Sequence, residues 1–241
     1  MKTPCTFLLV IALGGTLSAQ PTYIRTYSTI PHPRGVAVTS AGGLVVTGNY
    51  SDTECYLLRL HRDGTVSWMK RYVGSGNSGG GSNLNPCVLN EFYAVTEAAD
   101  GRLVVVGTAN GMLSAQRSVI CFDSLGTCLW GQTSGAETHS EMLDHAAAGD
   151  DNTAIVAGNS PDLFYQHATL FRYAVEDGTV LGGVRMLGGI STMAADIDFS
   201  PDGNILMTTG HFGDQVMKLT PGLAPIWRSS WANFSPDLIR G

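Results

Sequence analysis

Charged residues are scarce in this sequence of 241 residues. Only 14% of the residues are Asp, Glu, Lys or Arg, about half of the usual quarter, whereas 44% are hydrophobic. A disordered chain needs the opposite composition, many charges and few apolar residues. The 14 Lys and Arg against 20 Asp and Glu give a net charge of −6, without the basic excess that nucleic-acid binding requires. We therefore expect a folded protein that does not bind nucleic acid.

Long apolar runs are missing after the first twenty residues. Residues 7–13 form a short apolar run, which Lys2 precedes and the small residues Ser18 and Ala19 follow. A positive start, a short apolar run and a small-residue cleavage site are the parts of a secretory signal peptide. The run is shorter than the roughly 20 residues that span a bilayer. The sequence predicts a signal peptide at 1–20, a secreted or cell-surface location and no membrane span.

Zinc-type cysteine motifs are absent too: there is no Cys-x-x-Cys pair and no Cys/His cluster with metal-ligand spacing. Cys5 falls in the signal peptide, which leaves Cys55, Cys87, Cys121 and Cys128 in the mature chain. An exported protein can form two disulfides from these four. Cys121 and Cys128 flank a short turn and could pair across a hairpin, which would leave Cys55 for Cys87. Four buried thiols are the alternative, so the connectivity stays open.

Glycine, by contrast, is abundant, and it marks an internal repeat. Four segments share a strand, a Gly- or Asp-rich turn, an apolar strand ending in glycine, and a final hairpin, with units near 31–74, 90–135, 140–189 and 191–234. The strand-ending glycines lie between 51 and 59 residues apart, at Gly48, Gly107, Gly158 and Gly210. Four short strands at this period are typical of a β-propeller blade, which buries its faces only against neighbouring blades. We therefore expect an all-β propeller of about four four-stranded antiparallel blades.

The hairpin motifs show a resemblance to a known group. Residues 63–72 read Asp-Gly-Thr-Val-Ser-Trp-Met-Lys-Arg-Tyr, and residues 123–130 contain Asp123, Gly126 and Trp130, with the same spacing from Gly to Trp. These motifs resemble the propeller repeats of large secreted bacterial surface proteins, with a DGG turn and an L-x-x-x-D-x-x-G-x-x-x-W hairpin. The third unit departs at Gly182, where tryptophan is expected, and the fourth at 220–222, where the Asp turn is expected. The resemblance implies an architecture, and such repeats have no fixed catalytic residues.

The end of the sequence bears on whether the ring of blades closes. Residues 236–241 are similar to 31–35, where the first unit begins. We therefore expect a further blade to begin at 235 and the four blades to form an incomplete ring. A closed four-blade ring is one alternative, and a β-sandwich or β-solenoid is another.

Acidic residues occupy matching places in the third and fourth units. When the units are aligned on their turns, Asp144 and Asp196 fall at the same position of the first strand, with His145 and Asp198 close by. Neighbouring blades point equivalent positions the same way, so these carboxylates could converge near the central channel and suit a cation or polar ligand. Hydrated acids in a wet channel are the alternative. Asp144, His145, Asp196 and Asp198 are the candidate ligand-binding residues, and we predict no catalytic, metal or cofactor residue.

The leading functional hypothesis is a non-catalytic binding or display scaffold without a cofactor. We expect a monomer that meets an unidentified protein or carbohydrate through its loop faces, at 74–82 and 160–166. Residues 76–80 match the pattern G-x-S-x-G, but they lie in a Gly/Ser tract without the following helix that a nucleophile elbow requires. A quinoprotein-like propeller enzyme, suggested by residues 177–181, is the alternative, although its adjacent cysteine pair is absent. A passive spacer of a longer surface protein is the third possibility.

Overall fold

The structure of the chain is a computed structural model, and it describes residues 31–52, 54–73, 91–110, 115–134, 141–161, 166–186, 192–211, 215–230 and 239–240. Within these ranges every regular element is a β-strand. No helix long and apolar enough to cross a membrane occurs in the same ranges. The predicted signal peptide at 1–20, the insert at 74–82 and most of the loop at 160–166 lie outside the described residues.

The strands form four antiparallel sheets, and in each sheet four consecutive strands lie side by side in chain order. Blade 1 consists of β1 (Pro33–Val38), β2 (Leu44–Ser51), β3 (Glu54–Leu60) and β4 (Val66–Val73). Blade 2 consists of β5 (Glu91–Glu97), β6 (Leu103–Asn110), β7 (Ala115–Phe122) and β8 (Cys128–Ser134). Blade 3 consists of β9 (Met142–Ala148), β10 (Thr153–Pro161), β11 (Gln166–Ala174) and β12 (Val180–Met186). Blade 4 consists of β13 (Thr192–Phe199), β14 (Ile205–His211), β15 (Gln215–Leu219) and β16 (Pro225–Ser230), and the short β17 (Ile239–Arg240) pairs with β12 at the edge of blade 3.

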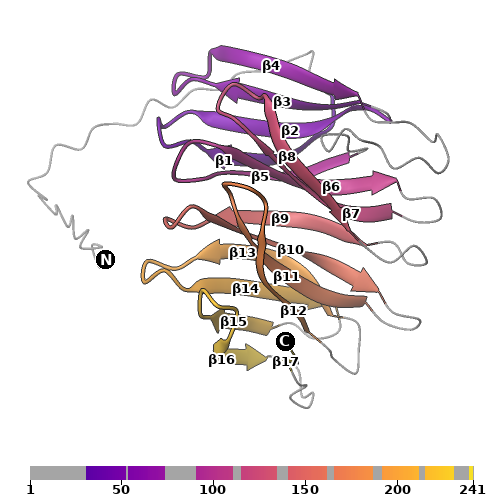
Figure 1. Cartoon of the computed structure of the whole chain (residues 1–241), viewed down its shortest axis with the longest axis vertical. Helices are drawn as coiled ribbons and strands as arrows, with labels where there is room; N and C mark the ends of the chain where they lie inside the picture. Colours follow the sequence, from indigo (N-terminus) through magenta and orange to yellow (C-terminus); the bar gives the residue numbers. More distant parts are fainter. Residues whose placement is uncertain are drawn as a thin grey trace, which may run out of the picture.

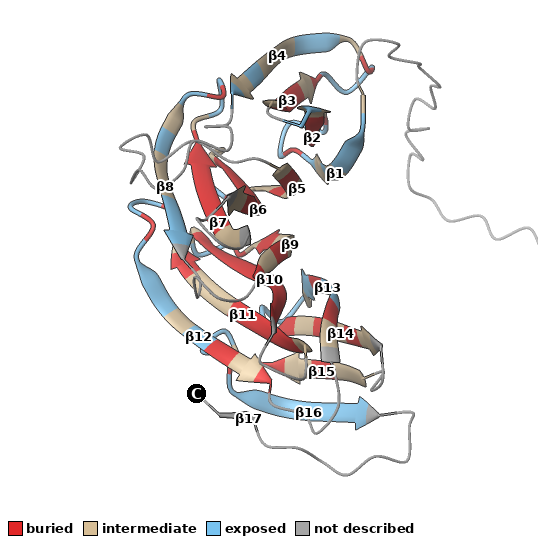
Figure 2. Ribbon diagram, turned by 90° about the vertical axis from the view of Figure 1, so that its right-hand side faces the viewer, coloured by how far each residue is buried: buried red, intermediate tan, exposed pale blue. Residues whose placement is uncertain are grey.

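The four blades follow one another in chain order, from β1–β4 at the top of Figure 1 to β13–β16 near the bottom. Turned by 90°, they lie along an arc, with the first strands β1, β5, β9 and β13 on its concave side (Figure 2). The fourth strands β4, β8 and β12 lie on the convex side. The sheets do not close on one another, so the prediction of an all-β propeller with four four-stranded blades in an incomplete ring is confirmed.

The blades are held together by apolar clusters between neighbouring sheets. Side chains alternate between the two faces of a strand, and here both faces are apolar: Val105 of β6 packs toward blade 1, whereas Val104 packs toward blade 3. A further cluster joins blades 3 and 4 around Ile155 and Met207. Because both faces of a central strand are buried, its sequence is a continuous apolar run rather than an alternating one.

A tryptophan near the end of a blade packs on the turn of the next blade. Trp68 of β4 lies so close to Gly126 that a β-carbon there would be 2.9 Å from Trp68 Cη2, and the hydroxyl of Tyr72 donates a hydrogen bond of 2.8 Å to the Gly126 carbonyl. Trp130 of β8 lies in the same way on Gly178, where a β-carbon would be 2.8 Å from Trp130 Cε3. Both glycines have left-handed backbones, with φ of +74° and +79°. Glycine is therefore required at Gly126 and Gly178 for two reasons: the left-handed backbone and the close packing of the tryptophan from the preceding blade.

Buried asparagines add a polar link between blades. Asn49, at the end of β2, accepts a hydrogen bond of 3.0 Å from the N–H of Phe92, on the first strand of blade 2. Asn159 of β10 accepts one of 3.0 Å from the N–H of Ala194, on the first strand of blade 4. Each asparagine therefore pairs a backbone donor of the next blade that would otherwise be costly to bury.

The cysteines do not pair as expected. Cys55 and Cys121 are buried thiols, and Cys128 forms a disulfide, so the possible pairings of Cys121 with Cys128 and of Cys55 with Cys87 are both wrong, and so is the alternative of four buried thiols. The register explains the first error, because Cys128 lies opposite Phe122 and Cys121 lies opposite Trp130. Burial raises the pKa of Cys55 and of Cys121 to about 12. Cys5 and Cys87 lie outside the described residues.

The contact between Trp68 and Gly126 predicts a specific loss of stability. Gly126→Ala should cost about 1–2 kcal/mol for the left-handed backbone and about 1–3 kcal/mol more for overpacking against blade 1. Gly101→Ala is the matched control, because Gly101 also has a left-handed backbone (φ +83°) but a β-carbon there has nothing within 4 Å. Urea unfolding measures both free energies. Equal losses in the two variants would contradict the packing of blade 1 on this turn.

Candidate functional site

The first strands, which line the concave side, each contain a β-bulge at the same place. One residue of each strand is skipped in the pairing with the second strand, and these residues are Arg34, Tyr93, Asp144 and Ala195. A bulge turns its side chain away from the regular alternation, and such bulges recur next to active sites. The candidate Asp144 therefore occupies a bulge on the inner surface of the propeller.

The strand register corrects the equivalence of the predicted acidic residues. His145 pairs with Ala157, and Asp196 pairs with Thr208 at the corresponding rung of blade 4. Asp196 therefore shares its position with His145, and not with Asp144 as the turn alignment indicated. The bulge occurs at the same rung in all four blades, so it shifts none of them relative to another. Asn152 (φ +57°) has the left-handed turn position that Gly203 has in blade 4, and His145 and Asp196 each lie seven residues before it.

Three of the four candidate residues come together where blades 3 and 4 meet. The Nε2 atom of His145 lies 3.4 Å from Asp144 Oδ1, and its Nδ1 atom lies 3.9 Å from Asp196 Oδ1. Asp196 is mostly exposed, whereas the other two side chains are largely covered. Asp198 is exposed, and its carboxylate accepts a hydrogen bond of 2.8 Å from the N–H of Phe199 instead of joining the group.

Asp144 is the unusual member of this group. Burial raises its pKa, and the neighbouring His145 offsets that effect only in part. Its Oδ1 atom is buried and accepts no hydrogen bond from the described residues. Among these residues, no group of three or more His, Cys, Asp or Glu side chains has an arrangement that could hold a metal ion. The buried Oδ1 atom of Asp144 is an acceptor that a hydrogen-bonding ligand could satisfy.

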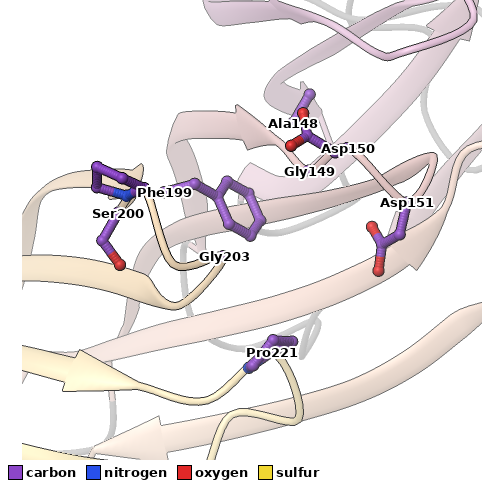
Figure 3. A pocket seen from close by; sticks show the side chains of 9 residues that line it. Ala148, Gly149, Asp150, Asp151, Phe199, Ser200, Gly203 and Pro221 are labelled. Atoms are coloured by element: carbon purple, nitrogen blue, oxygen red, sulfur yellow. The ribbon is translucent and has the colours of Figure 1, made fainter.

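A pocket of about 460 Å³ opens farther along the same interface, where turns of blades 3 and 4 meet (Figure 3). The turn after β9 supplies Asp150 and Asp151, the end of β13 supplies Phe199, and the following turn supplies Ser200. The ring of Phe199 lies between Ser200 on one side and the two aspartates on the other (Figure 3). The volume is within the range of about 300–1,000 Å³ that is usual for ligand sites.

Two differences from the equivalent corner between blades 1 and 2 explain why the pocket exists. In blade 2 the position of Phe199 is held by Glu97, which accepts hydrogen bonds from the Ser40 N–H at 2.5 Å and from Arg59 Nη2 at 2.8 Å. These bonds fill the corner between blades 1 and 2, and the Glu97 side chain is only 3% exposed. Between blades 3 and 4 a phenyl ring cannot accept such bonds, and Gly149 adds no side chain. The corner remains open.

The carboxylates of the pocket differ in how firmly they are held. Burial opposes ionisation of Asp151, but hydrogen bonds from Thr153 and Arg172 outweigh it and lower the pKa of this carboxyl. Asp150 is exposed at the rim. The pocket therefore offers one aromatic face and two acceptors of hydrogen bonds. The sequence analysis missed these residues, because the position of Phe199 holds a different residue in each blade (Val38, Glu97, Ala148 and Phe199) and gives no repeat signal.

Comparison with known proteins supports the fold. No protein-family model matches the chain, and no curated protein sequence matches it. A protein of unknown function from Bacteroides caccae is similar over 83% of this chain and 61% of its own, with a TM-score of 0.50 and 16% identity. The Dos1 propeller is similar over 81% and 46%, with a TM-score of 0.51 and 10% identity. A candidate gluconolactonase is similar over 81% and 62%, with a TM-score of 0.50 and 15% identity. The chain thus spans less than two thirds of each of these proteins.

The last comparison corrects one expectation. The chain was expected not to be an enzyme, because its repeats imply an architecture without fixed catalytic residues. A protein named as a candidate gluconolactonase has the same architecture, so that expectation is contradicted. The fold by itself is compatible with catalysis, and chemistry has to be argued from individual side chains.

The buried carboxylate of Asp144 predicts a stability that depends on pH. Its pKa is raised in the folded protein, so the folded state binds this proton more tightly than the unfolded chain does. Stability therefore falls as pH rises from the ordinary value of 3.8 through the raised pKa, and it stays lower at neutral pH. Asp144→Asn should raise the melting temperature at pH 7, and the gain should vanish below pH 3.8.

The matched control is Asp198→Asn, which removes an exposed carboxylate from the neighbouring first strand. Scanning calorimetry across pH 3–8 gives the melting temperatures of both variants and the parent. A destabilised Asp144→Asn protein at neutral pH would show that the ionised carboxylate stabilises the fold, contrary to this account.

Proposed function

We propose that this protein is an exported propeller that binds a carbohydrate in the pocket between blades 3 and 4. The observation on which the proposal depends is the pocket's combination of an aromatic ring, Phe199, with the carboxylates of Asp150 and Asp151. A sugar presents an apolar ring face and a rim of hydroxyl donors. The ring face packs on an aromatic side chain, and the hydroxyls donate to carboxylate oxygens.

The fold supports a site at this place. The pocket lies on turns between strands, and these turns are held by a rigid sheet on each side. Arg172 of β11 fixes the two sides relative to one another, since it forms an ion pair with Asp151 and donates a hydrogen bond of 3.0 Å to the carbonyl of Pro221. A preformed pocket loses little entropy on binding. The predicted signal peptide and the resemblance to secreted surface proteins support an extracellular carbohydrate as the ligand.

Binding to a glycan array of neutral, acidic and amino sugars tests this proposal. Asp150→Asn removes the charge of an exposed acceptor, and the loss of a charge-assisted hydrogen bond of about 1.5–3 kcal/mol weakens affinity by about tenfold or more. Asp52→Asn, in an exposed turn of blade 1, should leave binding unchanged. Calorimetric titration of the best array ligand measures both. Binding that is unaffected by Asp150→Asn would locate the ligand elsewhere.

Hydrolysis is a second candidate function, and it rests on a different observation. His145 lies between two carboxylates, 3.4 Å from Asp144 Oδ1 and 3.9 Å from Asp196 Oδ1. A carboxylate beside one ring nitrogen orients a histidine and supports its action as a general base toward water. A cyclic sugar ester is the natural test substrate, since one protein of similar fold is named as a candidate gluconolactonase.

Hydrolysis of gluconolactone, measured by the proton that the product acid releases, tests this second function. His145→Gln removes the base and should reduce kcat by 10²-fold or more if His145 acts this way. His61→Gln, on an exposed turn of blade 1, is the matched control. Hydrolysis at the uncatalysed rate with the parent protein, or equal rates in the parent and His145→Gln, would exclude this role for the cluster.

A further inference from the structure

The face of blade 4 that is turned away from blade 3 is constructed like the faces that join the other blades. Apolar clusters join blades 1 and 2, blades 2 and 3, and blades 3 and 4, but within the described residues none lies on this face. We call it the open face. By register it presents Asp198, Leu206, Val216, Lys218 and Trp227, which alternate with residues buried toward blade 3.

Trp227 occupies the position of the two tryptophans that link other blades. It pairs with the third strand at the same rung as Trp68 and Trp130, which lie on the turn glycines of the following blades. Trp227 is 45% exposed. The adjacent Ile226 is 47% exposed, but so is its counterpart Leu129 in a blade that has a following neighbour. Exposure is therefore normal at Ile226, whereas at Trp227 it marks an interface without its neighbouring blade.

The size of the residue at this position matches the turn that it covers. Trp68 and Trp130 each cover a glycine. Blade 3 has Gly182 at the same rung, and the turn of blade 4 has Leu223 in place of glycine, with Leu223 Cδ1 3.7 Å from where a β-carbon of Gly182 would be. Leu223 has a left-handed backbone, with φ of +67°, which is unfavourable for leucine. The two side chains that meet at this contact therefore compensate each other in size: a tryptophan covers a turn with glycine, and a glycine faces a turn with leucine.

Lys218 matches a second linking position. Arg59 and Arg172 occupy the same rung of their third strands and donate hydrogen bonds to turn carbonyls of the next blade, Ser124 at 3.2 Å and Pro221 at 3.0 Å. Lys218 has a cationic end at this rung, and it now forms an ion pair of 2.6 Å with Asp202 in its own blade. The ammonium group of Lys218, beside Trp227, is therefore at the place from which Arg59 and Arg172 donate to the turn carbonyls of the next blade.

We propose that the open face docks one further propeller blade whose third turn has glycine at the left-handed position. Trp227 covers that glycine, and Lys218 donates to a carbonyl of the same turn. The partner is thus a four-stranded antiparallel sheet of this repeat type, and the residue at 227 selects which turn it accepts. This inference concerns a different surface from the carbohydrate pocket, so either can fail without the other.

The chain itself offers a matched pair of partner blades. One extended protein has a copy of residues 91–134, with the glycine turn at Gly126, joined after Gly241 by a flexible linker, with Cys128→Ser in the copy. The other has a copy of residues 192–230, with the leucine turn at Leu223. Hydrogen–deuterium exchange of the appended segment reports whether it folds onto the protein. We expect protection of the copy with the glycine turn and no protection of the copy with the leucine turn.

Exchanging the residue at the centre of the face should reverse this preference. Trp227→Gly should abolish protection of the copy with the glycine turn and confer protection on the copy with the leucine turn, as Gly182 already accepts Leu223. Ile226→Ala, the equally exposed control, should change neither result. Protection of both copies or of neither would overturn the proposal. Dimerisation of the unextended protein in sedimentation equilibrium, lost on Trp227→Gly, would overturn it in favour of a second copy.

Discussion

Blades 2 and 3 each have two apolar faces, and neighbouring sheets bury both of them. Buried side chains such as Val104 and Val105 are neighbours in sequence but belong to different interfaces, one toward each adjacent sheet. Because apolar burial is the main favourable term in folding, a single blade is not stable alone and gains its stability from the blades beside it. The arrangement of the four sheets, the tryptophan contacts and the polar links between blades all follow from this requirement.

Close approach of the first strands is the second requirement. A β-carbon at Gly35 would lie 2.7 Å from the carbonyl oxygen of Tyr93, so the inner strands of blades 1 and 2 meet almost backbone to backbone. The bulges on the same strands turn Asp144 and its counterparts out of the regular alternation. The inner strands therefore combine tight packing with a set of re-aimed side chains. The residue that follows the bulge is Gly35 in blade 1 and Ala94 in blade 2, but His145 in blade 3 and Asp196 in blade 4. Polar side chains are therefore concentrated between blades 3 and 4.

Functional features arise where the repeat departs from its own pattern. Phe199 lies where blade 2 has the buried Glu97, and a pocket is found where blades 1 and 2 have a polar link. Gly182 takes the place of a tryptophan, and Leu223 fills the space across the interface. At Phe199 the space between the blades stays open as a pocket, whereas at Gly182 the larger side chain of Leu223 fills it. A repeat protein can thus be examined for sites by asking which departures are compensated by the neighbouring blade.

Much of the architecture could be predicted from the sequence, because the spacing of glycines, Asp-Gly turns and tryptophans follows directly from the backbone that each blade needs. Asp144 and Asp196 were expected to converge near the central channel, with His145 and Asp198 close by, and the first three of these lie together while Asp198 does not. The bulged position of Asp144, the unpaired thiol of Cys121 and the pocket beside Phe199 were decided by the tertiary structure. A bulge moves residues between faces without changing local propensity, and a pocket depends on the side chain that the next blade presents. Turn chemistry is local and can be read along the chain, whereas strand register and contacts between blades join residues about fifty positions apart.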